Sequence, residues 1–388
     1  MAGRNKYDLE FRVLESLSEA GRAAWKPLFE NMVQGYDYYR ACELAQPDVF
    51  RFFAAGVFDG DELIAGTPMF SVTFRLDMLM DGSLEPVGKW LHKKVPRFAN
   101  VPVVGAGSPH SDDLSLVFSS RLDDSRRAEA LEALLVGLHR HASDTGARVV
   151  FVKSVADSID RWANRHFAKL GYSRIASLPI ARLELPSSPE AYIASLSANM
   201  RSNLRRKLKK ARNIRVDVLD TITGLEGEIN SLRDQTRLRS RADYDVFEEL
   251  SPNYFSQVMK RMGGRARMLT YWDGERLIGF ALALIEQDRI IEKYTGLRYP
   301  DAIDNGVFFL NWMELVKLGI EQGVRELHAG ETTYLTKVRL GCKLERSWIY
   351  IRHRLDFMNP VLKAITPLLA FDKTDPDLKL LGGTAPYL

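Results

Sequence analysis

The sequence predicts an α/β protein of mixed α+β sheets, organised as two tandem domains of similar layout. The chain has 388 residues, enough for two or three domains at about 100–200 residues each. Hydrophobic residues make up 46% of it and charged residues 27%, which is ordinary for a globular protein and excludes disordered and fibrous classes. The tandem organisation is predicted from a repeated order of elements: hairpin, helix, glycine, strand and a Leu-Gly ending.

The repeat begins with two hairpins. Residues 57–66 and 271–280 each place an Asp-Gly pair between apolar runs, which is a strong short-range hairpin signal. In the first half the hairpin is followed by a helix (126–143), Gly146, a strand (147–152) and a Leu-Gly ending (166–172). In the second half the matching stretches are a helix (306–322), Gly323, a strand (324–328) and a Leu-Gly ending (337–342). We interpret this order as a tandem duplication, with chance similarity of common α/β parts as the alternative.

A stretch rich in proline and serine separates the two halves. Residues 185–190 read Leu-Pro-Ser-Ser-Pro-Glu, and a helix is predicted to begin at Pro189 with Ser187 or Ser188 as its cap. The chain therefore divides into three predicted segments. They are an N-terminal domain (1–186), a C-terminal domain (187–355) and a C-terminal tail (356–388).

The net charge and the cysteine content exclude several classes of protein. Lys and Arg total 54 against 50 Asp and Glu, so the net charge of +4 does not indicate a nucleic-acid partner. The two cysteines, Cys42 and Cys342, exclude a disulfide scaffold and a cysteine-based zinc cluster, and they suit a reducing cytoplasm. Residues 1–30 do not resemble a secretory signal, and no window reaches the about 18 consecutive apolar residues of a membrane span. We expect a cytoplasmic protein that at most lies on the inner face of the cytoplasmic membrane.

Three motifs carry a resemblance to a known family. His-Phe-Ala-Lys-Leu-Gly-Tyr at 166–172 resembles an ending common in the GNAT (N-acetyltransferase) fold. The segment 192–206, Tyr-Ile-Ala-Ser-Leu-Ser-Ala-Asn-Met-Arg-Ser-Asn-Leu-Arg-Arg, resembles the linking segment of the FemAB-like branch, which carries two such folds in one chain. The closing pattern at 334–341, Tyr-x-x-Lys-x-Arg-x-Gly, is similar as well. Together the likeness covers roughly residues 9–353.

The resemblance implies two tandem GNAT-like domains and an N-acyltransferase activity. The FemAB-like branch includes peptidoglycan-bridge aminoacyltransferases, polysaccharide-associated acyltransferases and acyl-CoA-dependent lipid N-acyltransferases. The lipid-directed enzymes, including bacterial ceramide synthase-like ones, best fit the apolar and basic segments of this chain. The implied co-substrate is therefore acyl-CoA, with no metal, and the implied acceptor is a long-chain, sphingoid-type primary amine.

Two alternatives stay open beside this interpretation. One is a FemAB-like transferase that uses aminoacyl-tRNA and acts on a peptidoglycan precursor, although the segment 219–254 is short for the helical arm common in such enzymes. The other is a non-catalytic assembly protein of the cell envelope. The GNAT pyrophosphate loop is not recognisable in either half, and Gly306 is the only glycine in 298–306. The mode of CoA binding is therefore left open.

The candidate catalytic residues follow two apolar strand patterns in the second half. His328, Glu331 and Tyr334 come at the end of one strand, where α/β proteins usually place their sites. A histidine titrates near neutral pH, which makes His328 the natural base, while Glu331 could orient it or act as the base itself. Tyr334 could donate a proton or an oxyanion hydrogen bond. Glu292 and Tyr294 on the preceding strand form a second set of candidates.

The first half is expected to shape the acceptor site without carrying the acid–base set. Lys153 and Ser154 stand at the place that His328 takes in the second half. His110 is followed by two aspartates (112–113), which could suggest a metal or triad fragment, but loops of this composition are common.

Basic residues gather directly after the linking segment. Residues 201–215 hold eight Lys and Arg and no acid, with Leu204, Leu208 and Ala211 at helical spacing. Such a helix can bind the phosphates of CoA, tRNA or anionic lipid headgroups, and a solvated helix face is the plain alternative. A second set, which could complete an anion site, is Arg233, Arg237, Arg239 and Arg241. The predicted cofactor-binding residues are Arg201, Arg205, Arg206, Lys209, Lys337 and Arg339.

Two further segments, 90–98 and 359–371, mix apolar with basic residues. They suit contact with a membrane interface and suit ordinary packing equally well. The predicted partners are therefore acyl-CoA, an amine acceptor that is a lipid, and an anionic membrane surface. Nucleic acid enters only in the alternative that uses tRNA.

Overall fold

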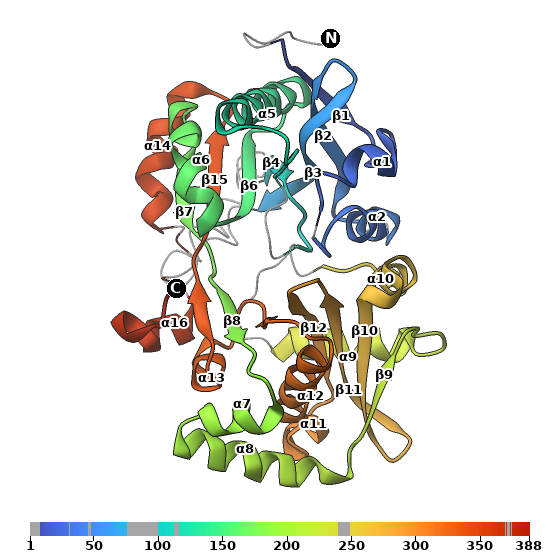
Figure 1. The fold of residues 1–388 in the computed structure, drawn as a ribbon. Coiled ribbons are helices and arrows are strands. Elements are labelled where there is room, and N and C mark those ends of the chain that lie inside the picture. Colours follow the sequence, from blue (N-terminus) through green and yellow to red (C-terminus); the bar gives the residue numbers. More distant parts are fainter. Residues whose placement is uncertain are drawn as a thin grey trace.

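The computed structural model describes residues 8–30, 32–45, 48–75, 100–111, 116–239, 249–368, 370, 373 and 375–388. Two mixed β-sheets, each flanked by helices, lie one above the other in the molecule (Figure 1). The predicted class, mixed α/β with two domains, is confirmed. The segment 90–98 and residues 112, 113 and 241 lie outside the described residues.

The first sheet has the strand order β1-β2-β3-β4-β6-β15-β7, with β5 paired to β3. Its strands are β1 (Glu10–Leu14), β2 (Arg51–Asp59), β3 (Glu62–Arg75), β4 (Asn100–Ala106), β5 (Val117–Phe118), β6 (Val149–Ala156), β7 (Ser173–Ala176) and β15 (Ser347–His353). Helices α5 (Asp124–Thr145) and α6 (Asp157–Lys169) pack on one face. Helices α1 (Gly21–Trp25) and α2 (Tyr36–Ala45) pack on the other.

The second sheet has the strand order β14-β8-β13-β12-β11-β10-β9. Its strands are β8 (Ile180–Glu184), β9 (Arg215–Leu219), β10 (Ala266–Asp273), β11 (Arg276–Ile285), β12 (Arg289–Leu297), β13 (Glu326–His328) and β14 (Lys343–Glu345). One face packs against α7 (Pro189–Ser195), α8 (Ala198–Lys210) and α12 (Val307–Glu321). The other packs against α9 (Glu226–Arg239) and α10 (Tyr254–Met262). The short helices α11 (Asp301–Asp304) and α13 (Tyr334–Arg339) flank α12 and β13 in the sequence.

The two sheets exchange a strand, because each sheet contains one strand from the other half of the sequence. The boundary between the sheets therefore does not fall at residue 186, where the sequence suggested a division between domains. Strand β8 precedes that boundary but lies in the second sheet, between β13 and β14. Strand β15 lies in the C-terminal segment but completes the first sheet, between β6 and β7. The green and orange strands therefore cross between the halves of the molecule in Figure 1.

Side-chain packing explains why β15 belongs to the first sheet. The ring of Tyr350 stacks on Phe167 of α6, with centroids 3.9 Å apart and planes 12° apart. Ile349 and Ile351 are buried with Ile175 of β7 on the other face of the sheet. Strand β15 thus joins the two cores on either side of the first sheet, although it follows the second domain in the sequence.

The locally encoded elements form as predicted. Both hairpins turn at their Asp-Gly pairs, where Gly60 and Gly274 have φ values of 59° and 58° that favour glycine. Helix α7 begins with Pro189 in its first turn, and the Ser188 side chain accepts a hydrogen bond from Ala191 N. Helix α5 ends at Gly146, which has a φ of 78°.

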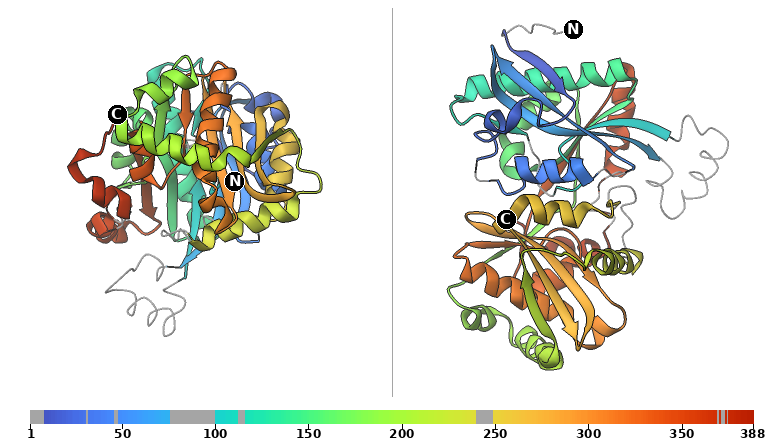
Figure 2. Two further views of the ribbon diagram at one scale, coloured as in Figure 1. Left: turned by 90° about the horizontal axis from the view of Figure 1, so that it is seen from below. Right: turned by 90° about the vertical axis from the view of Figure 1, so that its right-hand side faces the viewer.

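A continuous apolar core joins the two domains. Helix α2 of the first domain packs against α10 of the second, and their buried residues belong to one cluster. Within it the hydroxyls of Tyr38 and Tyr254 are hydrogen bonded at 2.7 Å. Figure 2 shows the α2 and α10 region filling the space between the sheets. The shared core shows that the two domains pack directly against each other.

The tail is ordered against both domains. Helix α14 (Asn359–Ile365) packs on β7 and β15, and α16 (Pro376–Leu381) packs on α13. In the described part of the chain, no helix combines the length and apolar character that crossing a bilayer requires.

Candidate functional site

A cleft lies in the second sheet at the end of the pairing between two parallel strands. Strands β12 and β13 are paired from Arg289–Ile291 to Glu326–His328, where β13 ends, whereas β12 continues to Leu297. The resulting cleft has a volume of about 340 Å³. Its lining comes from β12, the loop after β13, helices α9, α12 and α13, and the first domain: Glu292, Lys293, Tyr294, Thr295, Ala329, Gly330, Glu331, Thr332, Thr333, Arg233, Thr236, Arg237, Phe308, Lys337, Pro109 and Lys153.

A β-bulge brings consecutive β12 residues to the cleft. In the pairing with β11, Leu282 faces Tyr294 whereas Ala283 faces Glu292, so Lys293 is the extra residue. A bulge bends a strand and takes one residue out of the ladder of hydrogen bonds. Glu292, Lys293 and Tyr294 therefore line the same cleft despite being consecutive in the sequence.

Glu292 has its carboxylate fixed by two donors. Asn311 Nδ2 and Thr295 Oγ1 each donate a hydrogen bond of 2.7 Å to Oε1. Asn311 is buried on α12, and its Oδ1 accepts a hydrogen bond of 2.8 Å from the hydroxyl of Tyr271. Within the described residues Oε2 has no hydrogen-bond partner. Glu292 is therefore an oriented carboxylate with one oxygen available to a substrate.

Tyr294, the other residue of the second set of candidates, also lines the cleft. Its ring contacts Tyr254 edge-on, with centroids 5.4 Å apart, and Lys293 Nζ lies 5.3 Å from its centroid. Tyr254 in turn contacts His110 of the first domain, with centroids 5.5 Å apart. Tyr294 thus lies where the cleft meets the interface between the domains.

His328 does not line the cleft. It is buried, with 3% of its surface exposed. Arg289 Nη1 lies 3.3 Å from its Nδ1, and its Nε2 lies 3.3 Å from Glu326 Oε2. His328 therefore bridges two ion pairs within the sheet.

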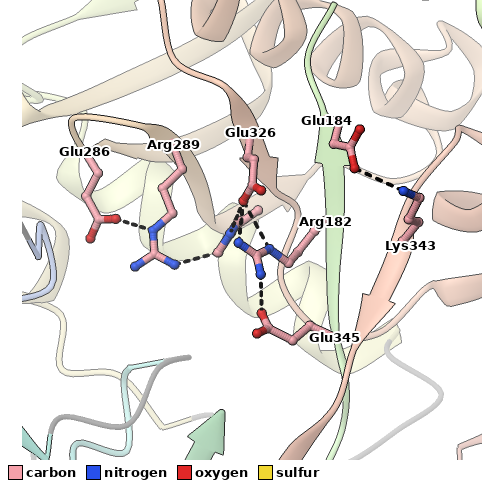
Figure 3. A network of polar contacts seen from close by, with 8 residues as sticks. Arg182, Glu184, Glu286, Arg289, Glu326, Lys343 and Glu345 are labelled. Atoms are coloured by element: carbon pink, nitrogen blue, oxygen red, sulfur yellow. Dashed lines mark hydrogen bonds and ion pairs between the residues drawn. The ribbon is translucent and has the colours of Figure 1, made fainter. Parts of the chain in front are cut away.

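The surroundings of His328 form a chain of charges across the sheet (Figure 3). Arg182 of β8 pairs with Glu326 and with Glu345, and Arg289 pairs with Glu286. The hydrogen bond from His328, together with Arg182, lowers the pKa of Glu326 to about 2 although partial burial opposes the shift. Glu286 also accepts a hydrogen bond of 2.6 Å from Val33 N of the first domain. The network links the second sheet to the domain interface.

The loop after β13 brings part of the other candidate set to the cleft. Glu331 lines it, in a turn where Gly330, Thr332 and Thr333 have φ values of 70°, 67° and 55°. Lys337 lines it too, but its buried Nζ donates to the backbone oxygens of Ala329 and Glu331. Lys337 therefore stabilises this strained loop.

Tyr334 lies outside the cleft lining. Its side chain is fully buried, and its hydroxyl donates a hydrogen bond of 2.8 Å to the backbone oxygen of Pro179. The structure thus gives Tyr334 a place in the core that joins α13 to the segment before β8.

The basic helix predicted to bind the cofactor is α8, and it lies away from the cleft lining. Arg201 Nη1 donates to the backbone oxygens of Ala194 and Leu196. Arg205, Arg206 and Lys209 are exposed on the outer side of α8, and Arg339 is exposed on α13. None of these five residues lines the cleft. The end of α8 does abut the start of α12, since a Cβ on Gly306 would lie 2.9 Å from Lys207 O.

Other cations line the cleft instead. Arg233 and Arg237 come from the second basic set that the sequence indicated, whereas Lys153 and Lys293 were not predicted to bind a substrate. Lys153 Nζ donates a hydrogen bond of 2.6 Å to Ser111 O, which ties β6 to the loop after β4. These four cations lie in one cleft because the two domains contact each other. The spacing of the residues in the sequence does not reveal that contact.

His110 lies behind this wall of the cleft. It is buried against Phe50, Phe52 and Tyr254, and burial together with the nearby cations lowers its pKa to about 3. A neutral histidine in an aromatic cluster supports the domain interface. Among the described residues, no three His, Cys, Asp or Glu side chains are grouped as metal ligands would be.

Comparison with known proteins agrees with this architecture. Residues 198–334 match the family model described as an acetyltransferase (GNAT) domain. No curated protein matches the chain. The matched stretch contains β12, α12 and β13, and therefore most of the residues that line the cleft.

Solved structures resemble the whole chain at low sequence identity. FemX has 13% identity over 86% of this chain and 94% of its own, with a TM-score of 0.55. A tandem GNAT protein from the clavulanic acid biosynthesis pathway has 14% identity over 89% and 99%, with a TM-score of 0.51. The C-terminal domain of a putative lysylphosphatidylglycerol synthetase from Agrobacterium fabrum has 11% identity over 89% and 95%, with a TM-score of 0.50. The chain therefore has a tandem GNAT fold, as its motifs indicated.

Proposed function

We propose that the protein transfers an acyl group from a thioester donor to a primary amine in the cleft between β12 and β13. The observation that carries the proposal is the oriented carboxylate of Glu292, one residue beyond the last paired residue of β12. This point lies in the domain that matches the GNAT acetyltransferase model. The first domain completes the cleft through Pro109 and Lys153.

The proposed reaction assigns a step to each polar group of the cleft. An amine attacks only when neutral, and Glu292 Oε2 would remove its proton directly or through one water. The neutral nitrogen then adds to the thioester carbonyl to give a tetrahedral intermediate. When this intermediate collapses the C–S bond breaks, Tyr294 donates its hydroxyl proton to the departing thiolate, and the nitrogen gives its second proton back to Tyr294, which leaves an amide and a free thiol. Glu292 is thus preferred to His328, which lies outside the cleft lining.

The proposed donor is acyl-CoA, and the proposed acceptor is a long-chain, sphingoid-type amine. Support for CoA comes from the cations of the cleft, since its phosphates need basic partners. Support for the lipid amine comes from the sequence resemblance and not from the cleft, where most of the lining residues are of polar or charged types. The acceptor is therefore the part of the proposal that most needs a direct assay.

Transfer from an aminoacyl-tRNA is a second candidate. The observation that favours it is the exposed basic side of α8, which abuts the start of α12 next to the cleft residue Phe308. A polyphosphate chain could lie along such a surface. The likeness to FemX is compatible with either donor because it shows the fold alone.

The first experiment separates these candidates. Calorimetry with CoA thioesters of increasing chain length measures donor binding, and mass spectrometry detects N-acyl products formed with sphinganine. Glu292→Gln should lower turnover by about 10²–10⁴-fold while retaining donor binding. Glu275→Gln, in an exposed hairpin turn, is the matched control. No binding of any CoA thioester would reject the CoA proposal, and unchanged turnover in Glu292→Gln would reject the base.

A further inference from the structure

The C-terminal segment concentrates exposed apolar side chains. Among the described residues ten large hydrophobic side chains are exposed, and five of them lie between residues 355 and 380. They are Leu355 (43% exposed), Phe357 (72%), Val361 (54%), Ile365 (40%) and Leu380 (72%). Single exposed apolar residues are normal on a protein surface, but a cluster of them marks an interaction site.

Each helix of this segment is apolar on two sides. Phe357, Val361 and Ile365 recur every four residues, so they follow one edge of α14 and the turn before it. Leu362 points the other way and packs against the Ile175, Ile349 and Ile351 cluster of the first domain. The exposed edge is therefore additional to the edge that anchors the helix.

Helix α16 repeats this arrangement on the second domain. Leu378 is buried in the second core while Leu380 is exposed. Figure 1 shows α14 and α16 on the same side of the molecule, one on each domain, and the left view of Figure 2 agrees. The two helices together form a surface, here named the tail surface, that extends over both domains.

The tail surface carries three exposed lysines. Lys363, Lys373 and Lys379 are exposed, and none of them pairs with a carboxylate among the described residues. The three described acids of this segment each have a hydrogen-bond or ion-pair partner. Asp356 pairs with Arg352, Asp375 accepts from Leu378 N, and Asp377 accepts from Leu335 N.

We propose that the tail surface docks the protein on an anionic lipid bilayer. Exposed apolar side chains on short helices can enter the boundary between headgroups and acyl chains, and lysines beside them bind lipid phosphates. A stable protein interface needs about 800 Å² of complementary surface on each partner. Five apolar side chains spread over α14, the turn before it and the separate helix α16 fit a deformable bilayer better than a second copy of the chain. The inference holds whether or not the protein transfers acyl groups.

Vesicle sedimentation of the full chain tests the proposal. The protein should sediment with vesicles of phosphatidylcholine mixed with phosphatidylglycerol and far less with phosphatidylcholine alone. The double variant Phe357→Ser, Val361→Ser should bind at least about tenfold more weakly, because two large apolar side chains no longer enter the lipid. Lys363→Glu should weaken binding to anionic vesicles only.

The control is Val218→Ser, which removes an exposed apolar side chain (49% exposed) from β9. It should bind vesicles as the unaltered protein does, and thermal unfolding should show that all variants remain folded. Three results would overturn the proposal: no sedimentation with anionic vesicles, equal binding by the double variant, or a dimer in light scattering that the double variant abolishes. None of these readouts depends on catalytic turnover.

Discussion

Asn311 of α12 donates a hydrogen bond of 2.7 Å from Nδ2 to Oε1 of Glu292 on β12. This bond connects the helix that covers one face of the second sheet to the strand that lines the cleft. Asn311 is itself held by the buried hydroxyl of Tyr271 at 2.8 Å. The carboxylate of Glu292 is therefore positioned from the core, and its orientation depends on residues that do not touch a substrate.

Removal of Asn311 should impair turnover without removing the proposed base. In Asn311→Ala, Glu292 keeps only the bond from Thr295, and the hydroxyl of Tyr271 loses its acceptor. We expect kcat to fall by about 10–100-fold, with a smaller change in KM, because a misplaced base acts mainly on the chemical step. Thiol release from acyl-CoA in the presence of an amine measures both parameters.

The matched control is Gln322→Ala, at the exposed end of the same helix. It should leave kcat unchanged. If Asn311→Ala also turned over at the unaltered rate while folded, the bond between Asn311 and Glu292 would have no role in positioning.

His328 should matter for stability and not for the acid–base step. His328→Ala leaves Glu326 and Arg289 without the imidazole between them. Loss of partners for such part-buried groups costs about 1–3 kcal/mol, so urea unfolding should shift to lower concentration. We expect kcat within about threefold of the unaltered value. A fall of about 10²-fold or more at unchanged stability would identify His328 as the base.

Glu326 should make the protein sensitive to acid. Its pKa in the folded state is lowered from 4.5 to about 2, first by the hydrogen bond with His328 and then by Arg182. A lowered folded pKa stabilises the fold above the unfolded value, and this contribution is lost as pH falls from about 4.5 towards 2. Glu326→Gln should be less stable near neutral pH and lose less additional stability on acidification. Thermal unfolding from about pH 7 to about pH 3 measures this, with Glu275→Gln as the control.

Sequence reasoning succeeded where structure is encoded locally. The Asp-Gly pairs at Gly60 and Gly274 and the Ser188 cap are specified by neighbouring residues, and each forms as predicted. The bulge at Lys293 depends on its pairing with β11, so the sequence could name Glu292 and Tyr294 but could not show that they face one cleft. The position of His328 at the end of a strand pattern is visible in the sequence, whereas its contact with Arg289 depends on the pairing of β13 with β12.

The strand exchange could not be predicted for a similar reason. An apolar pattern in the sequence predicts that β8 and β15 are strands. It does not predict which sheet each strand joins. The assignment is decided by long-range packing, such as that of Tyr350 against Phe167.

Tyr350→Ala should therefore destabilise the first domain although it lies after the second domain in the sequence. The change removes a buried ring, its stack on Phe167 and the hydrogen bonds of its hydroxyl with Asp160 and Asn164. We expect the free energy of unfolding to fall by about 3–5 kcal/mol. Limited proteolysis should detect faster cleavage within residues 116–176, and Trp348→Phe, at a less buried site on the same strand, should have a smaller effect. A strand that completes a sheet stabilises that sheet, so weakening β15 should expose the first domain to the protease. Faster cleavage confined to residues 187–345 would mean that β15 stabilises the second domain instead.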